Sequence, residues 1–407
     1  MHFELTNDQR VYFGLEPIQS NWDRLVLKGD TYRPESILYF DGDVIKRHIV
    51  STERQYKESR YDDATKGRTI LLPVTDKGKE KKLTASVLEA RQPKGVYCLI
   101  ETTGRLLIGN YNTQTTFYDT FWEQQGTSEL KSINILVENF IKTSAENHLS
   151  EIAAFKKSKK RNIGFKPGDF FAFKINRTEY GFGRILLNID ELKKANLIPK
   201  HHGLSIIMTK PILVKLYSFV SSTKHINIDV LEKIPALPSD YMMDNLLFYG
   251  EYEIIGHRNL TENDFDFPMS YGRHISALRY SIFLQWGLIH LEKSATSFDK
   301  YLTAENPFVA KENASRKKMN PYGYYSIGFR PMYNGVDIKE TIENNGVYDF
   351  QKRPTFKNAF DLRNPQNNEI RIEIMEAFGL DPFKSYDDNC ELTNTINTKK
   401  LLTLISR

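Results

Sequence analysis

The sequence is poor in cysteine and has no long apolar segment. Only Cys98 and Cys390 occur among 407 residues, too few for a disulfide framework or a cysteine-based zinc site. Cys98 lies in the apolar run Val96–Ile100, so we expect a buried structural thiol. The longest apolar stretch, Tyr280–Leu291, is interrupted by Gln285 and is too short to span a bilayer. Because MHFELTNDQR at the start also lacks an apolar signal segment, we expect a cytoplasmic protein without a membrane anchor.

Strong cofactor and nucleophile motifs are also missing. The sequence has no phosphate-binding GxxxxGK[ST] loop and no GxSxG nucleophile elbow. Gly181-Phe182-Gly183-Arg184 begins like a dinucleotide loop but lacks the third glycine and the helix that should follow. We therefore predict no cofactor.

Histidines are spread along the chain, and only His201 and His202 are adjacent. Neighbouring side chains on a strand point to opposite faces, so this pair is a poor metal site. His257, beside Arg258 at the end of an apolar run, is the one candidate for acid–base chemistry. No partner nucleophile is recognisable, and we predict neither a metal centre nor an enzyme.

Two pairs of closely spaced carboxylates, Asp41 with Asp43 and Asp264 with Asp266, allow two interpretations. Such pairs can bind Mg²⁺ or Ca²⁺. Both pairs lie in turn-like sequence, where aspartate is favoured because its side chain bonds to nearby backbone. We favour the turn interpretation.

Charge is close to balance, with 56 basic and 51 acidic residues and a formal net charge of +5. Two basic runs, Lys77–Lys82 and Lys156–Arg161, are interpreted as solvated segments. The second run follows an expected helix, where its cations would complement the helix dipole. Nucleic-acid binding is therefore not our leading expectation, because it requires a gathered basic stripe.

The length and pattern predict an α+β protein, dominated by strands in twisted antiparallel sheets, with a long connecting amphipathic helix and a mixed C-terminal region. The expected parts are a β-rich domain (1–126), the connecting helix (127–161), an α+β domain (162–272) and the mixed region (273–407). Only the third of these parts carries a distinctive motif.

In the first part, turn signals predict two hairpins. Ile37–Phe40 and Val44–Val50 flank Asp41-Gly42, and Val96–Glu101 and Leu106–Asn110 flank Thr103-Gly104. A further strand or short helix is expected over Thr115–Trp122. Thr6 and Gln9 have the spacing of a helix capping box.

The connecting segment shows helical periodicity from Glu129 to Lys157. Its apolar residues recur mostly at spacings of three and four: Leu130, Ile133, Val137, Phe140, Ile141, Leu149, Ile152 and Phe155. This pattern predicts one helix of about eight turns.

In the third part we expect a hairpin from Asp169–Ile175 and Tyr180–Leu187, followed by strands at Ser205–Met208 and Ile212–Val220. A short helix or loop is expected near Asp229–Lys233, and then a closing strand segment over Leu246–His257 with a bend at Gly250.

In the last part, Ile275–Leu291 is expected to form either a helix or a strand pair. Glu369–Gly379 reads as an amphipathic helix capped by Gly379, and Thr398–Arg407 as a final short helix.

One motif goes further than these patterns. The sequence KPGDFFAFKI (166–175), followed by EYGFGRIL (179–186), resembles the opening of the immunity protein 26 family, in which two such strands meet across a tight hairpin. Ile212–Tyr217 and Tyr249–His257 are similar to later strands of that family. The resemblance covers about 105 of 407 residues.

The motif also has a physical interpretation. Its shared residues are Gly168, Asp169, Phe171, Tyr180, Gly181, Gly183 and Arg184. The two glycines of the second strand permit close backbone approach or a sharp twist. We expect Phe171, Phe173, Tyr180 and Phe182 to form cross-strand aromatic pairs, and Asp169 to cap its strand or pair with Arg184.

The resemblance implies a bacterial immunity protein that neutralises a polymorphic toxin by covering its active face. The partner would be the cognate toxin, and the best guesses at contact residues are Arg177, Arg184, Tyr322, Tyr324 and Tyr325. The identity of the toxin and the oligomeric state stay open.

Two alternatives remain. A metal-dependent hydrolase would have to gather His201, His202 and His257, and a nucleic-acid-binding module would use Lys156–Arg161.

Overall fold

The computed structural model describes residues 3–74, 77–123, 130–199, 202–206, 210–274, 279–298, 300–301, 334–350 and 360–405. The chain divides into two compact units. Unit 1 comprises residues 1–163 with the short stretches 174–179 and 246–251, and unit 2 comprises the remaining residues. The three boundaries between the four parts suggested by the sequence stay predictions, because the two units are defined by spatial contacts and not by independent folding.

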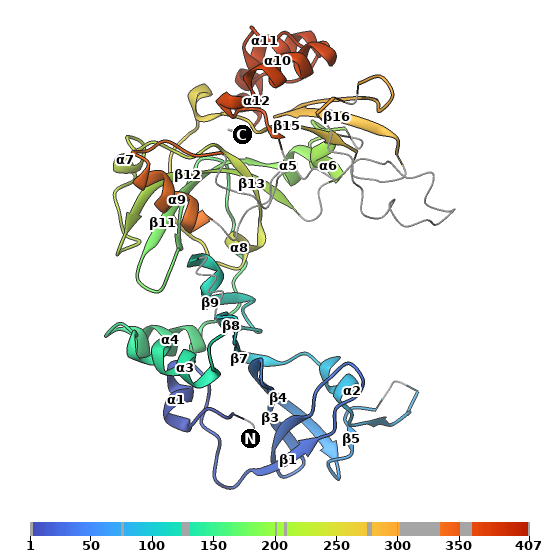
Figure 1. Ribbon diagram of the computed structural model, residues 1–407, viewed down its shortest axis with the longest axis vertical. Helices are drawn as coiled ribbons and strands as arrows, with labels where there is room; N and C mark the ends of the chain where they lie inside the picture. Colours follow the sequence, from blue (N-terminus) through green and yellow to red (C-terminus); the bar gives the residue numbers. More distant parts are fainter. Residues whose placement is uncertain are drawn as a thin grey trace. The chain divides into compact units, whose positions relative to one another are not determined.

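Unit 1 is built on an antiparallel sheet with strand order β1-β2-β3-β4-β7-β8-β9, and β5 and β6 extend from β4 (Figure 1). Its strands are β1 (Asp23–Leu27), β2 (Ser36–Asp41), β3 (Val44–Ser51), β4 (Gln55–Lys66), β5 (Ile70–Leu71), β6 (Lys81–Lys82), β7 (Lys94–Glu101), β8 (Leu106–Asn110) and β9 (Thr115–Asp119). Its helices are α1 (Asn7–Tyr12), α2 (Ala85–Glu89), α3 (Ile133–Lys142) and α4 (His148–Lys157), and a 3₁₀ turn spans Thr120–Glu123.

The local signals for unit 1 are confirmed. Gly42 has φ +57° in the β2–β3 turn, and Gly104 has φ +91° between β7 and β8. Thr6 and Gln9 form the expected capping box at the start of α1. Cys98 is fully buried in the main core, which raises the pKa of its thiol well above the ordinary value. The core packs β7, β8 and β9 against α1, α3 and α4.

The prediction of one continuous connecting helix was wrong, because two helices, α3 and α4, are separated by residues 143–147. The hydroxyl of Thr143 donates to the carbonyl of Asn139 at 2.7 Å, and that of Ser144 donates to the carbonyl of Phe140 at 2.9 Å. Side chains thus satisfy the last carbonyls of α3 and favour a helix end. His148 begins α4 buried, with Nε2 2.8 Å from the carbonyl oxygen of Tyr12.

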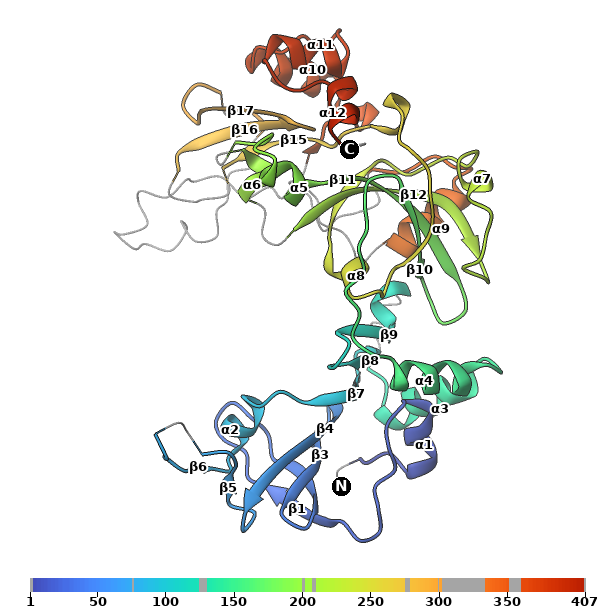
Figure 2. The same cartoon turned by 180° about the vertical axis from the view of Figure 1, so that it is seen from behind.

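Unit 2 contains two further antiparallel sheets, ordered β13-β12-β11-β10-β14 and β17-β16-β15-β18 (Figure 2). The strands are β10 (Asp169–Lys174), β11 (Tyr180–Asn188), β12 (Pro211–Ser221), β13 (Asp240–Met243), β14 (Glu253–His257), β15 (Met269–Arg273), β16 (Ser281–Trp286), β17 (Ile289–Ser294) and β18 (Phe360–Asp361). The helices from this part of the chain onwards are α5 (Ile189–Lys194), α6 (Gly203–Ile206), α7 (Ile228–Leu231), α8 (Asn245–Phe248), α9 (Asn334–Glu343), α10 (Asn368–Ala377), α11 (Tyr386–Leu392) and α12 (Thr398–Ile405). The α+β class is thereby confirmed.

Two strand predictions in this region need correction. Ser205 belongs to helix α6 and not to a strand, because the Nδ1 atom of His202 accepts from the backbone N–H of Leu204 and closes a tight turn. Leu246–His257 is a strand only from Glu253 onwards, since it begins in α8 and turns at Gly250 with φ +76°.

The elements observed in the C-terminal region agree closely with those predicted from the sequence. The strand-pair interpretation of Ile275–Leu291 is confirmed by β16 and β17, which meet across a turn at Gly287. Helix α10 ends at Gly379, whose φ of +81° makes it the expected capping glycine. Apolar residues of α10 and α11 pack on β15–β17, and Cys390 is buried among them. Figure 1 shows the ribbons of α10 and α11 next to β15 and β16. None of the helices in the described ranges has both the length and the apolar character that crossing a membrane requires.

Candidate functional site

The first shared residue of the motif in unit 2 is Gly168, at a position where no residue with a Cβ atom fits. Gly168 has φ +93°, and a Cβ atom there would lie 2.4 Å from the carbonyl oxygen of Arg258. Its N–H donates to the carbonyl of Ile185 at 2.8 Å, and its own carbonyl accepts from the N–H of Arg258 at 3.1 Å. This glycine therefore attaches the start of β10 both to β11 and to the segment after β14.

Asp169 organises the same corner through both carboxylate oxygens. Oδ2 accepts from the backbone N–H of Lys166 at 2.9 Å, which is the expected capping role. Oδ1 lies 2.7 Å from Nδ1 of His257, the residue opposite Asp169 in the β10–β14 register. The predicted alternative, a pair between Asp169 and Arg184, was wrong, because Arg184 has other partners.

Arg184 is 3% exposed and binds the inward side of the 257–264 loop. Its guanidinium donates to Oδ1 of Asp264 at 2.8 Å and to the carbonyls of Arg258 and Asn259 at 2.9 and 3.0 Å. The cation also lies 4.7 Å from the ring centroid of Phe170. One buried arginine thus holds three points of a loop that has little regular structure of its own.

Asp264 completes this buried group, which we call the Arg184 network (Arg184, Lys215 and Asp264). Lys215 donates to Asp264 at 2.5 Å, and the N–H and hydroxyl of Thr261 donate to it at 2.8 and 3.1 Å. Burial acts to raise the pKa of Asp264, but the hydrogen bond from Lys215 and the other donors outweigh it and hold the pKa below its ordinary value. The ionised carboxylate therefore stabilises the fold at neutral pH, and this contribution is lost as the pH falls through that lowered pKa.

On the solvent side of this network, the 257–264 loop and α7 form an exposed charged surface. Arg258 makes ion pairs with Asp229 of α7 and with Glu232 just after it. Val230, which lies between Asp229 and Glu232 in the sequence, is 47% exposed. We call the exposed side chains of Asp229, Val230, Glu232, Arg258 and Asn259 the α7 face.

Gly183 allows the close approach expected of the motif. A Cβ atom there would lie 2.4 Å from Cζ of Phe171 and 2.9 Å from the carbonyl oxygen of Lys215. The aromatic partners differ from the prediction, because Phe171 and Phe173 stack on Tyr252 at 5.6 and 4.7 Å. Phe182 packs against Phe219 at 5.7 Å between ring centroids. The pairs therefore involve β12 and the segment before β14, which the two-strand motif could not reveal.

Of the predicted partner-contacting residues, Arg177 lies in the part of the β10–β11 turn that belongs to unit 1. It donates to the carbonyl of Phe140 at 2.9 Å and to the hydroxyl of Ser144 at 2.5 Å, at the C-terminal end of α3. A cation there complements the helix dipole. Tyr322, Tyr324 and Tyr325 lie outside the described residues, and the contact role of all these residues stays a prediction.

The histidines named for a hydrolase lie in different surroundings. His202 is buried, with Nε2 2.8 Å from the carbonyl oxygen of Leu288 and its ring 5.1 Å from that of His290. His257 is bound to Asp169 instead, and His201 lies outside the described residues. In the described ranges, no group of three or more His, Cys, Asp or Glu residues is arranged to hold a metal ion.

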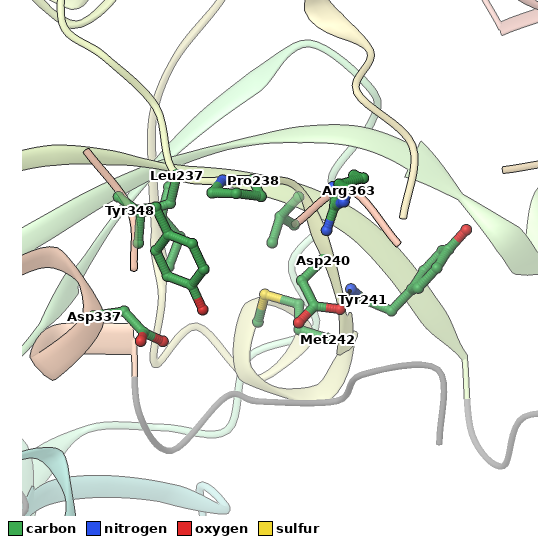
Figure 3. A pocket seen from close by; sticks show the side chains of 10 residues that line it. Leu237, Pro238, Asp240, Tyr241, Met242, Asp337, Tyr348 and Arg363 are labelled. Atoms are coloured by element: carbon green, nitrogen blue, oxygen red, sulfur yellow. Dashed lines mark hydrogen bonds between the residues drawn. The ribbon is translucent and has the colours of Figure 1, made fainter. Parts of the chain in front are cut away.

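A small pocket in unit 2 offers about 50 Å³ beside β12 and β13, enough for a few water molecules. Figure 3 shows Asp337 and Tyr348 on one side of this space and Asp240 and Arg363 on the other. Nothing in its lining resembles a nucleophile with a base.

Glu251 is a titratable group in unusual surroundings that sequence reasoning missed, since an isolated glutamate carries no local signal. Burial raises its pKa from 4.5 to about 7, although the N–H of Thr116 donates to it at 2.7 Å. A raised carboxyl pKa penalises folding progressively as the pH rises from about 4.5 to about 7, and the penalty is constant above that range.

Replacing Glu251 with glutamine should therefore stabilise unit 1 by about 2 kcal/mol at pH 8 and have little effect at pH 4, because the amide oxygen still accepts from Thr116. Urea unfolding across this pH range, combined with hydrogen exchange that assigns the change to unit 1, measures the effect. Glu253→Gln is the control, because Glu253 belongs to unit 2 and pairs with Lys224. This variant should leave unit 1 unchanged and should not gain stability at either pH. Equal effects of Glu251→Gln at pH 4 and pH 8 would contradict the assignment.

Comparison with known proteins supplies one match. Residues 166–280 match the family described as Immunity protein 26, which confirms the suspected resemblance over the segment that carries Gly168, Asp169, Arg184 and the α7 face. No curated protein and no solved structure matches the chain.

Proposed function

Because residues 166–280 match a family of immunity proteins, we propose that this protein is an immunity protein that binds a protein toxin and blocks its active face. The match is the observation that carries the proposal. Its motif residues lie in the interior and shape a surface, as expected when a family signature preserves a binding scaffold.

The α7 face is the surface that we propose for the toxin. It combines an exposed apolar side chain, Val230, with charged neighbours on both sides. The Arg184 network lies directly beneath the loop that supplies Arg258 and Asn259. A loop held in this way loses little conformational freedom on binding, which favours affinity.

Neutralisation by occlusion needs no chemistry from the immunity protein. A one-to-one complex that covers roughly 1,600 Å² in total is sufficient to exclude substrate from a toxin's active face. Arg184 acts in this proposal as a positioning residue, because its side chain is directed to its own loop and not to solvent.

The direct test uses the full chain and the product of the neighbouring gene, purified as an inactivated variant. We expect a stable one-to-one complex by size-exclusion chromatography, and rescue of growth when the active neighbour is expressed together with this protein. A neighbour that is toxic but neither binds nor is neutralised would overturn the proposal for that partner.

Replacing Val230 with arginine should weaken this complex about tenfold or more, because a buried apolar contact at an interface centre becomes a charge that must be desolvated. Isothermal titration calorimetry measures the change. Leu392→Arg is the matched control, since Leu392 is 54% exposed on α11, outside the matched segment. Equal weakening of the complex by both variants would contradict toxin binding at the α7 face.

A further inference from the structure

The N-terminal unit has a groove between two sheet edges, outside the segment that matches the immunity family. β1 is the end strand of its sheet and pairs only with β2 among the described residues. β6 is the outer strand of the β5–β6 extension. Residues of both edges line one groove of about 460 Å³. We call it the β1–β6 groove; its lining residues are Leu25, Val26, Leu27, Leu38, Phe40, Arg68, Thr69, Ile70, Lys82, Leu83 and Thr84.

The floor of the groove is apolar and well packed. Leu38 and Phe40 of β2 are buried at 2% and 0% exposure and belong to a small core with Leu71 and Leu88. Along the rim, by contrast, Val26 is 54% exposed. Sheet edges usually carry proline, inward charges or a covering segment, because an open edge invites pairing with another strand. β1 begins with the charged residues Asp23 and Arg24, and its second half presents the exposed apolar residues Leu25 and Val26.

The side of the groove formed by β5, β6 and the residues beside them contributes two basic side chains to the lining, Arg68 and Lys82, and further lysines lie nearby in the sequence. Residues 66–82 contain six basic and two acidic side chains. Lys77, Lys81 and Lys82 are exposed, whereas Arg68 is held by Asp23 of β1 at 2.6 Å. A partner that enters the groove therefore meets an apolar floor, an open backbone edge and two basic side chains.

We propose that the β1–β6 groove binds an extended acidic peptide segment of a partner protein as an added strand along β1. The backbone of the segment pairs with the open edge of β1, alternate apolar side chains lie beside Leu25 and Leu27 of β1, and carboxylates meet Lys82 of β6. This site is separate from the α7 face and does not depend on the proposed toxin binding.

Two blocked fluorescent peptides test the proposal on the full-length protein. Each has five alternating valines and threonines, followed by four glutamates in one peptide and four lysines in the other. Fluorescence anisotropy should show binding of the glutamate peptide, at least about tenfold weaker binding of the lysine peptide, and weakening as salt is raised. Failure of the glutamate peptide to bind, or equal affinity for both peptides, would overturn the proposal.

Hydrogen exchange distinguishes strand addition from loose electrostatic attraction. The bound glutamate peptide should slow amide exchange in residues 23–27, because their outward N–H groups gain carbonyl partners. Binding without protection of β1 would contradict the strand-addition geometry.

Charge-reversed variants locate the site. The double variant Lys81→Glu with Lys82→Glu should bind the glutamate peptide about tenfold less tightly. Lys157→Glu with Lys159→Glu is the matched control, because both lysines are exposed in the other basic run of the same unit. Equal losses in the two double variants would show that net charge alone attracts the peptide, and the proposal would fail.

Discussion

Replacing Glu58 with glutamine is expected to destabilise unit 1 by about 3–5 kcal/mol, the largest effect among the substitutions considered. Glu58 has no exposed surface, and its carboxylate lies 3.1 Å from Nε of Arg10 and 3.5 Å from Nε of Arg47. The hydroxyl of Tyr56 donates to it at 2.5 Å. Both arginines are at most 3% exposed, so a neutral amide would leave two guanidinium groups in the interior without their shared counter-charge.

The measurement is urea unfolding, combined with hydrogen exchange by mass spectrometry to assign the loss to unit 1. A combined signal from two units does not report one free energy, which is why the localised readout is needed. Glu53→Gln is the control, because Glu53 is exposed on the turn before β4 and should change stability by less than about 0.5 kcal/mol.

A second substitution tests whether the loss comes from unpaired charge. Adding Arg10→Met to the Glu58→Gln variant should recover part of the stability, because it removes one of the two cations that shared Glu58 and fills the space with an apolar chain; Arg47 keeps its ion pair with Glu16 at 3.6 Å. A further loss in the double variant would contradict the electrostatic explanation.

Replacing Arg184 with alanine should cost about 3 kcal/mol in unit 2 and free the 257–264 loop. The change removes charge-assisted hydrogen bonds to Asp264 and to two backbone carbonyls, and these partly buried acceptors lose their donor. Faster amide exchange in residues 257–264 should accompany the lower unfolding midpoint. If the α7 face binds the toxin, affinity should fall as well, although Arg184 itself is not exposed.

Arg258→Ala is the matched control for this prediction. Its ion pairs with Asp229 and Glu232 are exposed, and exposed pairs of this kind contribute between zero and about 1 kcal/mol. The Arg258→Ala variant should therefore be about as stable as the unchanged protein, while its toxin binding weakens. Comparable loss of stability in both variants would argue against a dominant role for the buried arginine.

Local patterns in the sequence were sufficient wherever a few neighbouring residues determine the backbone. Asp41-Gly42 and Thr103-Gly104 predicted their hairpins because glycine accepts positive φ in a tight turn. The prediction of one long helix was wrong for a related reason. The side chains of Thr143 and Ser144 end α3, while the apolar period of the sequence continues beyond them. Ser205 was misassigned because a contact from His202, and not local propensity, closes its turn.

The sequence by itself determined the α+β class, most of the strands and the family resemblance of the segment around Gly168 and Arg184, since these depend on local period, turn residues and a contiguous motif. Only the tertiary structure decided which charges meet. Arg184 pairs with Asp264, 80 residues away, and Glu58 joins Arg10, 48 residues away, because folding brings distant strands and loops together. The same holds for the β1–β6 groove, whose two edges belong to strands more than 50 residues apart. Partners of buried charges and the lining of grooves depend on packing, which no local pattern encodes.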